Sequence, residues 1–279
     1  MPQKHVDMLF RNRQNRRPGH LRLRLAVLAI AYVAAPAAVD AAEHYVGEAY
    51  ARNGTLLYRE LHWLYREGNS DARLVLYVCP DGTPFARKHV LSRVNAQSPD
   101  FELDDARDGF DEGVRTQAGI QQVFVHPRAD AAERSAVVAK NGDTVIDAGF
   151  DAFVRDHWDA LAAANGKVAL SFVVPSRLTA LDFQVSHIGE ERIGGREARR
   201  FRLGLARWYG GLLPHIDVVY DIAARRLLRY EGVSNIRDAN ARNLDVRIEF
   251  PFSENLLPAS DAEIAAATNA ALSGGCNLP

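Results

Sequence analysis

The sequence predicts a mainly β protein: a strongly curved antiparallel sheet, or unclosed β-barrel, with a central helix and a C-terminal helix. Three observations predict this class. Apolar and polar residues alternate with a period of two through most of residues 42–279. Turn-forming pairs such as Asn53-Gly54 separate the alternating segments. Only residues 150–165 and 261–272 carry helical spacing or helix-end signals.

Thirteen strand segments follow from this alternation, interrupted by the central helix. The clearest is Leu244–Phe250, in which every second residue is apolar. Val168–Val174 is almost wholly apolar, which predicts burial on both faces. With no repeat or linker between the strands, residues 42–279 are predicted to form a single domain. The other predicted strands are Tyr45–Arg52, Thr55–Tyr65, Arg73–Cys79, Phe85–Val94, Phe101–Ala106, Phe110–Gln117, Gln121–His126, Leu181–Ser186, Phe201–Leu205, His215–Asp221 and Arg226–Asn235.

The two helices have recognisable ends. Asn165-Gly166 stops the central helix, because both residues accept the left-handed conformation of a helix cap. Ser260 and Glu263 form a capping box at the start of the C-terminal helix. Four apolar residues of the central helix fall on one face: Phe150, Val154, Trp158 and Leu161.

The first 41 residues have the parts of an export signal. Seven Lys and Arg residues precede the uncharged segment Leu25–Ala35, and the small-residue site Val39-Asp40-Ala41 follows it. As a helix, the uncharged segment is roughly 16 Å long, about half the thickness of a bilayer's hydrocarbon core. We therefore expect cleavage near Ala41 and export to the periplasm, by either the Sec or the twin-arginine route.

The charge of the exported part argues against nucleic-acid binding. Residues 1–41 hold seven of the 34 Lys and Arg and two of the 35 Asp and Glu, which leaves 27 basic against 33 acidic residues and a formal charge of −6. Nucleic-acid binding rests on clustered basic residues. No later apolar run reaches the length of a membrane-spanning helix.

Cys79 and Cys276 are the two cysteines of the chain. In an oxidising compartment they are a natural disulfide pair, worth about 2–4 kcal/mol. Two unpaired thiols are an equal alternative, because spacing alone does not fix the geometry of a bond.

Aromatic residues are the candidates for a ligand site. Those on or beside strands either floor a concavity or fill an ordinary sheet core. The apolar loop 208–214 is the best candidate for a ligand rim or a partner contact, because exposed apolar surface usually marks a contact. The candidate ligand or partner residues are Trp63, Tyr65, Phe183, Trp208, Tyr209, Leu212 and Leu213; Tyr77 and Phe172 belong to the same set of strand aromatics.

No catalytic, cofactor or metal site is predicted. The histidines after residue 42 are scattered singly, and the sequence lacks a nucleophile elbow, a P-loop and a dinucleotide-binding glycine motif. The acidic stretch 100–112 is interpreted as a polar hairpin with solvated acids. The polar cluster Ser234–Asp238 either forms a turn or lines the mouth of a pocket.

One part of the chain resembles a known group. A Gly194-Gly195 turn feeds the strand around Phe201, and the hairpin of 216–221 and 226–230 follows. This pattern, within Asp182–Phe250, is similar to uncharacterised exported bacterial proteins related to the outer-membrane lipoprotein carrier superfamily. The resemblance implies an unclosed β-barrel whose open side is covered by helices and whose apolar concavity holds acyl chains. It implies no ligand residue at any position.

Two functions follow from these features. The favoured one is a non-enzymatic periplasmic protein that holds an apolar small molecule or lipid chain in the curved sheet. The alternative is an envelope assembly or interaction module with a packed core, which contacts a protein through loop 208–214. A hydrolase assembled from distant residues ranks below both. A hollow concave side would favour the first function, and a filled one the second.

Overall fold

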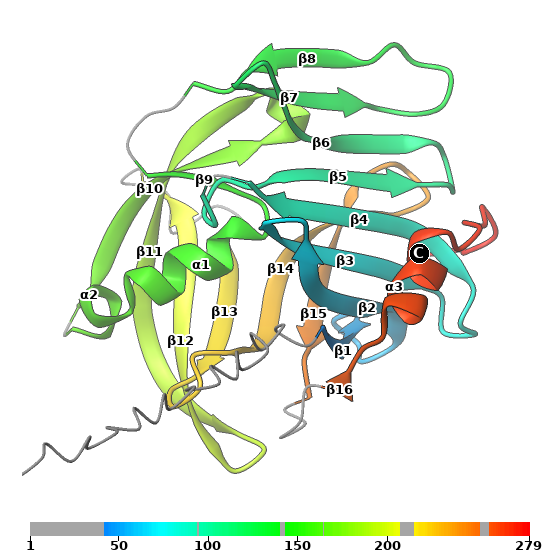
Figure 1. Cartoon of the computed structure of the whole chain (residues 1–279). Coiled ribbons are helices and arrows are strands. Elements are labelled where there is room, and N and C mark those ends of the chain that lie inside the picture. Colours follow the sequence, from blue (N-terminus) through cyan, green and yellow to red (C-terminus); the bar gives the residue numbers. More distant parts are fainter. Residues whose placement is uncertain (1–41, 94, 140–142, 164, 207–214, 252–256) are drawn as a thin grey trace, which may run out of the picture. The chain divides into compact units, whose positions relative to one another are not determined.

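The computed structural model describes residues 42–279 except 94, 140–142, 164, 207–214 and 252–256. These residues belong to one compact unit. The fold class predicted from the sequence is confirmed, because the described strands form one large curved sheet that does not close (Figure 1). All but one of its strand pairings are antiparallel.

The first half of the sheet is a meander in which each strand pairs with the next along the chain. Short turns join most of these strands, and Asn53-Gly54 lies in the first of them, where Gly54 has a φ of 85°. The strands are β1 (Glu43–Tyr50), β2 (Leu56–Glu67), β3 (Ser70–Val78), β4 (Pro84–Ser92), β5 (Asp100–Asp105), β6 (Phe110–Gln117), β7 (Ile120–His126) and β8 (Arg134–Val137).

The second half is joined to the first through pairing of β1 with β15. Its outermost strand, β9, runs parallel to β10. The two-residue strand β16 pairs with β1. The strands of this half are β9 (Thr144–Ile146), β10 (Lys167–Val174), β11 (Thr179–Ile193), β12 (Arg196–Leu205), β13 (Ile216–Asp221), β14 (Leu227–Arg237), β15 (Asn243–Glu249) and β16 (Leu257–Pro258).

The sheet has two edges, β8 and β9, which do not pair with each other. Apolar side chains lie between them instead. Val138, directly after β8, belongs to the same buried cluster as Ile146 of β9 and Val173 of β10. The barrel is thus unclosed in its hydrogen bonds, although side chains pack across the opening.

Two short helices lie inside the curve of the sheet, α1 (Gly149–Asp156) and α2 (Trp158–Ala162) (Figure 1). The predicted apolar face is the one that packs. Val154, Trp158 and Leu161 form one buried cluster with residues of β10–β13. The helix breaks at His157. Asn165 has a φ of 59°, the left-handed conformation predicted for the end of the helical segment.

The C-terminal helix α3 (Asp261–Thr268) lies on the other face of the sheet. Its predicted capping box is present, with the Ser260 side chain accepting from Glu263 N and the Glu263 side chain accepting from Ser260 N. Ile264 and Ala267 pack on Trp63 of β2 and Leu76 of β3. The helix ends at Thr268, four residues earlier than predicted. No described helix is long and apolar enough to cross a membrane.

Some sequence predictions differ from the structure. Strands β8, β9 and β16 were not predicted, because two to four residues are too few to display alternation. Strand β10 is buried on both faces, as predicted, only from Leu170 onward, because Ala169 is exposed. Leu170 packs in the cluster with the helices, and Val173, on the opposite face, packs in the cluster between the two sheet edges. The apolar run therefore indicated burial of both faces correctly for the second half of the strand.

Candidate functional site

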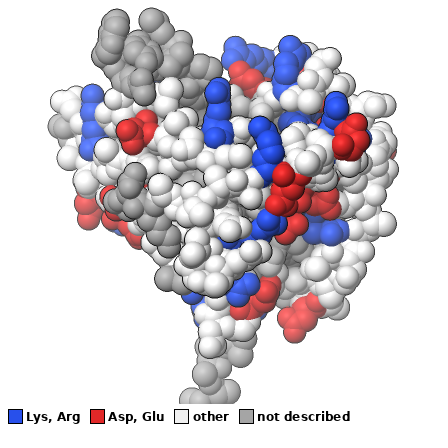
Figure 2. Space-filling model, turned by 90° about the horizontal axis from the view of Figure 1, so that it is seen from above, with Lys and Arg blue, Asp and Glu red and all other residues white. Residues whose placement is uncertain are grey.

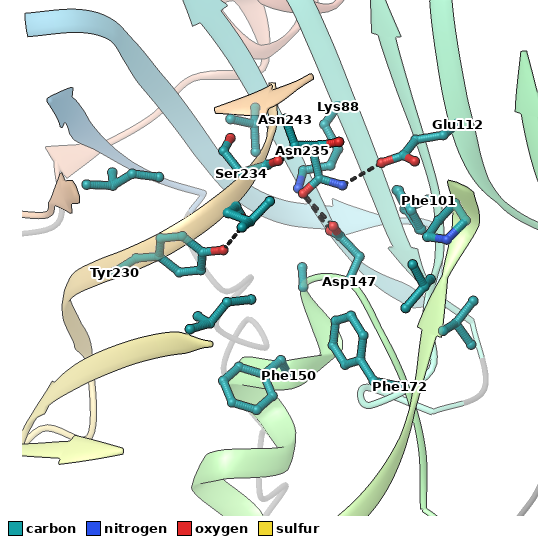
Figure 3. Close-up of a pocket in the computed structure, with 18 of the residues that line it drawn as sticks. Lys88, Phe101, Glu112, Asp147, Phe150, Phe172, Tyr230, Ser234, Asn235 and Asn243 are labelled. Atoms are coloured by element: carbon teal, nitrogen blue, oxygen red, sulfur yellow. Dashed lines mark hydrogen bonds and ion pairs between the residues drawn. The ribbon is translucent and has the colours of Figure 1, made fainter. Parts of the chain in front are cut away.

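The concave side of the sheet contains a partly open cavity of about 590 Å³. Its lining comes from both halves of the sheet and from the start of α1. Aromatic and aliphatic side chains make up most of it. Charged and amide side chains are gathered in the upper part of the close-up view, and Phe150 and Phe172 in the lower part (Figure 3).

Strand register explains which residues of the first half face the cavity. Residues that lie directly opposite each other on neighbouring strands share a face, so one cross-strand row gives a line of inward side chains. All of this row except Leu103 lines the cavity. The row is His62, Val75, Lys88, Leu103, Glu112, Val125 and Arg134, one residue from each of β2 to β8.

The lower part of the cavity is aromatic. Phe150 at the start of α1 lies edge-on to Phe172 of β10, with ring centroids 6.4 Å apart. Phe172 in turn lies edge-on to Phe183 of β11 at 5.9 Å. Such edge-to-face contacts hold the rings in fixed positions. They give this part of the cavity a firm apolar wall.

The upper part, here called the polar end, consists of Lys88, Glu112, Asp147, Ser234, Asn235 and Asn243 (Figure 3). Lys88 Nζ lies 3.1 and 3.0 Å from the two carboxylate oxygens of Asp147. Both side chains are largely buried, with 13% and 8% of their surface exposed. The carboxylate of Asp147 offsets the charge of Lys88, and a buried cation requires such an anion next to it.

Glu112 is the other buried acid of the polar end, and only 4% of the residue is exposed. Asn235 Nδ2 donates to Glu112 Oε1 at 2.6 Å. Burial raises the pKa of Glu112 from 4.5 to about 7. A substantial fraction of Glu112 is therefore protonated near neutral pH, and the protonated carboxyl is a hydrogen-bond donor as well as an acceptor.

The two polar residues beside Asn235 are fixed by hydrogen bonds. Asn243 Nδ2 donates to the Ser234 carbonyl oxygen at 2.7 Å. Ser234 Oγ lies 3.0 Å from Tyr58 Oη, and it accepts from Ile236 N at 3.0 Å. The strand end that carries Ser234 and Asn235 is thus held in one conformation.

Away from the polar end, Glu60 and His62 form a buried pair on β2. Glu60 Oε2 lies 3.0 Å from His62 Nε2, and both residues are at most 7% exposed. The His62 ring stacks on Tyr45 at 4.5 Å between centroids. Burial lowers the pKa of His62, so the imidazole is neutral at neutral pH.

The largely buried basic side chains of the lining have acidic partners in the structure. Arg73 lies 3.7 Å from Asp151 of α1. Arg237 donates to the Asp108 carboxylate and, at 3.1 Å, to the Pro127 carbonyl oxygen. Arg134 also lines the cavity and is exposed. The buried cations of the lining therefore already have anions next to them.

A second cavity, of about 610 Å³, adjoins the first. Three of the residues that line both cavities are His62 of β2, Arg73 of β3 and Asp151 of α1. Its own lining is more polar and includes Arg66, Asp71 and Arg155. The start of α1 thus borders both cavities.

The structure does not bring all the candidate ligand or partner residues together at one site. Phe183 lines the first cavity. Trp63 lies on the opposite face of β2, in the cluster under α3. Tyr65 packs beside that cluster and reaches the second cavity. Trp208, Tyr209, Leu212 and Leu213 lie outside the described residues.

Of the other strand aromatics, Tyr77 and Phe172 line the first cavity. So do three residues of the polar cluster 234–238, namely Ser234, Asn235 and Arg237, which fits the pocket-mouth interpretation. The structure also pairs Cys79 with Cys276 as a disulfide, with Cα atoms 5.9 Å apart. This bond attaches the C-terminal tail to the end of β3.

Sequence reasoning missed the acids of the cavity. The prediction that the acids of 100–112 are solvated is wrong for Asp105 and Glu112, which are 1% and 4% exposed. The missed signal was the period of two itself, because Glu112 stands between the inward residues Phe110 and Val114. Lys88 and Asp147 are 59 residues apart and had no local signal.

No metal site is evident in the part of the chain that the structure describes. Within these residues, no three His, Cys, Asp or Glu side chains converge as metal ligands would. The buried polar groups named above are arranged as pairs, each with a partner on the protein.

Among the known proteins compared with this chain, only solved structures are similar to it. The sequence matches no protein-family model, and no curated protein matches it. A beta-barrel-like protein of the domain of unknown function DUF1849 from Brucella abortus is similar over 75% of this chain and 95% of that chain, with 7% identity and a TM-score of 0.46.

Two further structures are similar at lower scores. A DUF1329 family protein from Desulfovibrio piger covers 84% of this chain and 91% of its own, with 10% identity and a TM-score of 0.30. A putative outer membrane lipoprotein-sorting protein domain from Vibrio parahaemolyticus covers 81% and 88%, with 10% identity and a TM-score of 0.27. Scores below 0.5 do not establish a common fold, so the description of this fold rests on its own strands.

Proposed function

We propose that the protein is a non-enzymatic periplasmic protein that binds an apolar small molecule or lipid chain inside the curved sheet. The observation that carries the proposal is the cavity of about 590 Å³ on the concave side. Small-molecule sites typically have about 300–1,000 Å³ and a mainly apolar lining with a few polar groups. The cavity has both properties.

Packing energetics support the same function. Protein interiors are close-packed and contain few voids larger than a water molecule. A solid-cored interaction module, the alternative function, would fill the concave side with side chains. Aromatic side chains such as Phe172 and Phe183 instead border open space. Filling this space with a hydrocarbon ligand would remove further apolar surface from water, at about 25 cal/mol per Å².

The test is direct binding of an apolar probe. We expect the fluorescence of the uncharged dye N-phenyl-1-naphthylamine to rise saturably when the dye is added to the purified protein. Native mass spectrometry of protein that has not been delipidated is expected to show a co-purified apolar molecule. A protein that binds no dye and carries no such molecule would contradict the proposal.

A pair of matched variants locates the binding. Ala148 borders both cavities, so Ala148→Trp fills space where the ligand would lie. Ala223 is exposed in the turn after β13, and Ala223→Trp adds the same side chain outside the cavity. We expect the first variant to lose dye binding and the second to keep it. Equal binding by both would place the dye elsewhere.

The export of the chain is part of the proposal. The basic residues, the uncharged segment Leu25–Ala35 and the small residues up to Ala41 support a cleaved signal. In a bacterial host, the periplasmic fraction should contain a protein whose N-terminal residue lies close to Ala42. Recovery of the uncleaved chain from the cytoplasm would contradict it.

A further inference from the structure

We propose that the polar end of the cavity binds the uncharged, hydrogen-bonding head group of a single-chain amphiphile, such as an alcohol, and selects against carboxylate and phosphate heads. This inference rests on the proposed function, because it assigns the chemistry of the ligand that the cavity would hold. It concerns Glu112, Asn235 and the Lys88–Asp147 pair, whose placement follows from the strand register and the start of α1.

The first argument is the charge balance of the cavity. Its lining contains four acidic residues and four basic ones. Among the basic ones, Lys88 contacts Asp147, Arg73 lies beside Asp151, and Arg237 donates to the Asp108 carboxylate. The fourth, Arg134, is exposed. At the buried polar end, an anionic head group would therefore have to displace one of these acids or lie near them without a cation of its own.

The second argument is the state of Glu112. Its hydrogen-bond donor among the described residues is the Asn235 amide, which is uncharged, and neither Lys88 nor an arginine lies within ion-pair distance of it. A buried carboxyl without a cation is more stable when protonated. The pKa of about 7, raised by burial, agrees with this geometry. The protonated carboxyl can donate to a hydroxyl and accept from it.

The third argument is the cost of desolvation. A ligand chain in the cavity removes water from around Glu112 and further disfavours its ionised form. An uncharged head adds no charge to this environment. A carboxylate or a phosphate head would bring a negative charge next to Glu112 and Asp147, and an ammonium head would require Glu112 to ionise first.

The experiment measures head-group preference with chains of equal length. N-phenyl-1-naphthylamine is bound to the wild-type protein at about pH 6, where a free carboxylate is ionised and Glu112 is mostly protonated. The dye is then displaced with dodecanol, dodecanoate or dodecylamine. Because leaving a buried polar group unpaired costs on the order of a factor of ten in affinity, dodecanol should bind at least about tenfold more tightly than dodecanoate.

Variants of Glu112 test the assigned residue. Glu112→Gln keeps an uncharged hydrogen-bonding group and should keep the preference for dodecanol. Glu112→Leu removes the partner of the hydroxyl and should lower the affinity for dodecanol about tenfold relative to the affinity for the dye, which is measured separately for each variant. Glu102→Leu, on the exposed side of the neighbouring strand β5, is the matched control and should change neither affinity.

The outcomes separate the two proposals. Absence of dye binding overturns both of them. Dye binding with dodecanoate equal to or tighter than dodecanol overturns the head-group assignment alone, and the exposed lining residue Arg134 would then be the first cation to test by substitution. Tighter binding of dodecylamine would make Glu112 a cation site and would also overturn the assignment.

Discussion

Lys88 Nζ lies 3.0 Å from Asp147 Oδ2, and this ion pair connects strand β4 to the segment directly before helix α1. A second, longer pair joins Arg73 of β3 to Asp151 in the first turn of α1. The helix packs by its apolar side on the second half of the sheet. These two ion pairs therefore attach it to the first half, and together the contacts hold α1 across the inside of the sheet.

Breaking the buried pair should destabilise the protein. Asp147→Asn leaves the Lys88 charge buried without an anion, and we expect a loss of about 3 kcal/mol in the free energy of unfolding. Asparagine is the suitable replacement, because residue 147 has a φ of 41°, which asparagine tolerates. Unfolding in urea, followed by circular dichroism, measures the loss.

The matched control is Asp71→Asn. Asp71 pairs with Arg66 on the surface, where 72% and 45% of the two side chains are exposed. A surface pair contributes at most about 1 kcal/mol. If the two variants were destabilised equally, the Lys88–Asp147 pair would not have the stabilising role assigned to it.

Glu112 makes stability depend on pH. Its pKa is about 7 in the folded protein and near 4.5 when exposed. Between these values the folded state binds more protons than the unfolded state, so stability falls as pH rises. The contribution is full below about pH 4.5 and lost above about pH 7, and amounts to about 3 kcal/mol as an upper bound.

Ionisation of Asp111 also lowers the stability of the folded protein as pH rises. Burial, and then the nearby Glu102 and Asp104, raise its pKa to about 7. Asp111 faces the outside of the sheet, is partly exposed and is more strongly screened. Thermal melting between pH 5 and pH 8 should therefore show a clear decline for the wild type, a shallower one for Glu112→Gln, and an intermediate one for Asp111→Asn. A Glu112→Gln curve as steep as that of the wild type would rule out this origin.

Most of the fold was predictable because it depends on local patterns. Alternation located most strands, and the pair Asn53-Gly54 located the first hairpin. The face to which each strand turns was harder. One face of strand β2 carries Trp63 and packs under α3, and the other face carries His62 and lines the cavity. The apolar side of a strand does not indicate the cavity when a helix covers that side.

The site was predictable only in part. Phe183 and the cluster beginning at Ser234 were recognised because they stand on clear strands or at their ends. Glu112 faces the interior through pairing of β6 with β5 and β7. Asp147 reaches Lys88 only because α1 crosses the sheet. These contacts depend on the assembled sheet, and a local pattern carries no information about them.

The close contact of α1 with the connection between β4 and β5 gives another prediction. A Cβ atom on Gly149 would lie 2.0 Å from the carbonyl oxygen of Gln97. Gly149→Ala must therefore move the start of α1, and because α1 borders both cavities, we expect lower stability and weaker dye binding together. Gly204→Ala in β12 has open space around its Cβ and should leave both properties unchanged. Loss of stability without any change in dye binding would contradict the link between α1 and the cavity.

The disulfide between Cys79 and Cys276 links residues that are 197 positions apart. Cys276 and Leu278 are buried in the same cluster as Tyr77 and Phe85. Breaking the bond releases the tail and enlarges the conformational freedom of the unfolded chain, at a cost of about 2–4 kcal/mol. Unfolding in urea with and without dithiothreitol measures this cost. The double variant Cys79→Ser with Cys276→Ser should be as unstable as the reduced wild type and insensitive to the reductant. A wild type whose unfolding midpoint does not move on reduction would contradict the expected contribution.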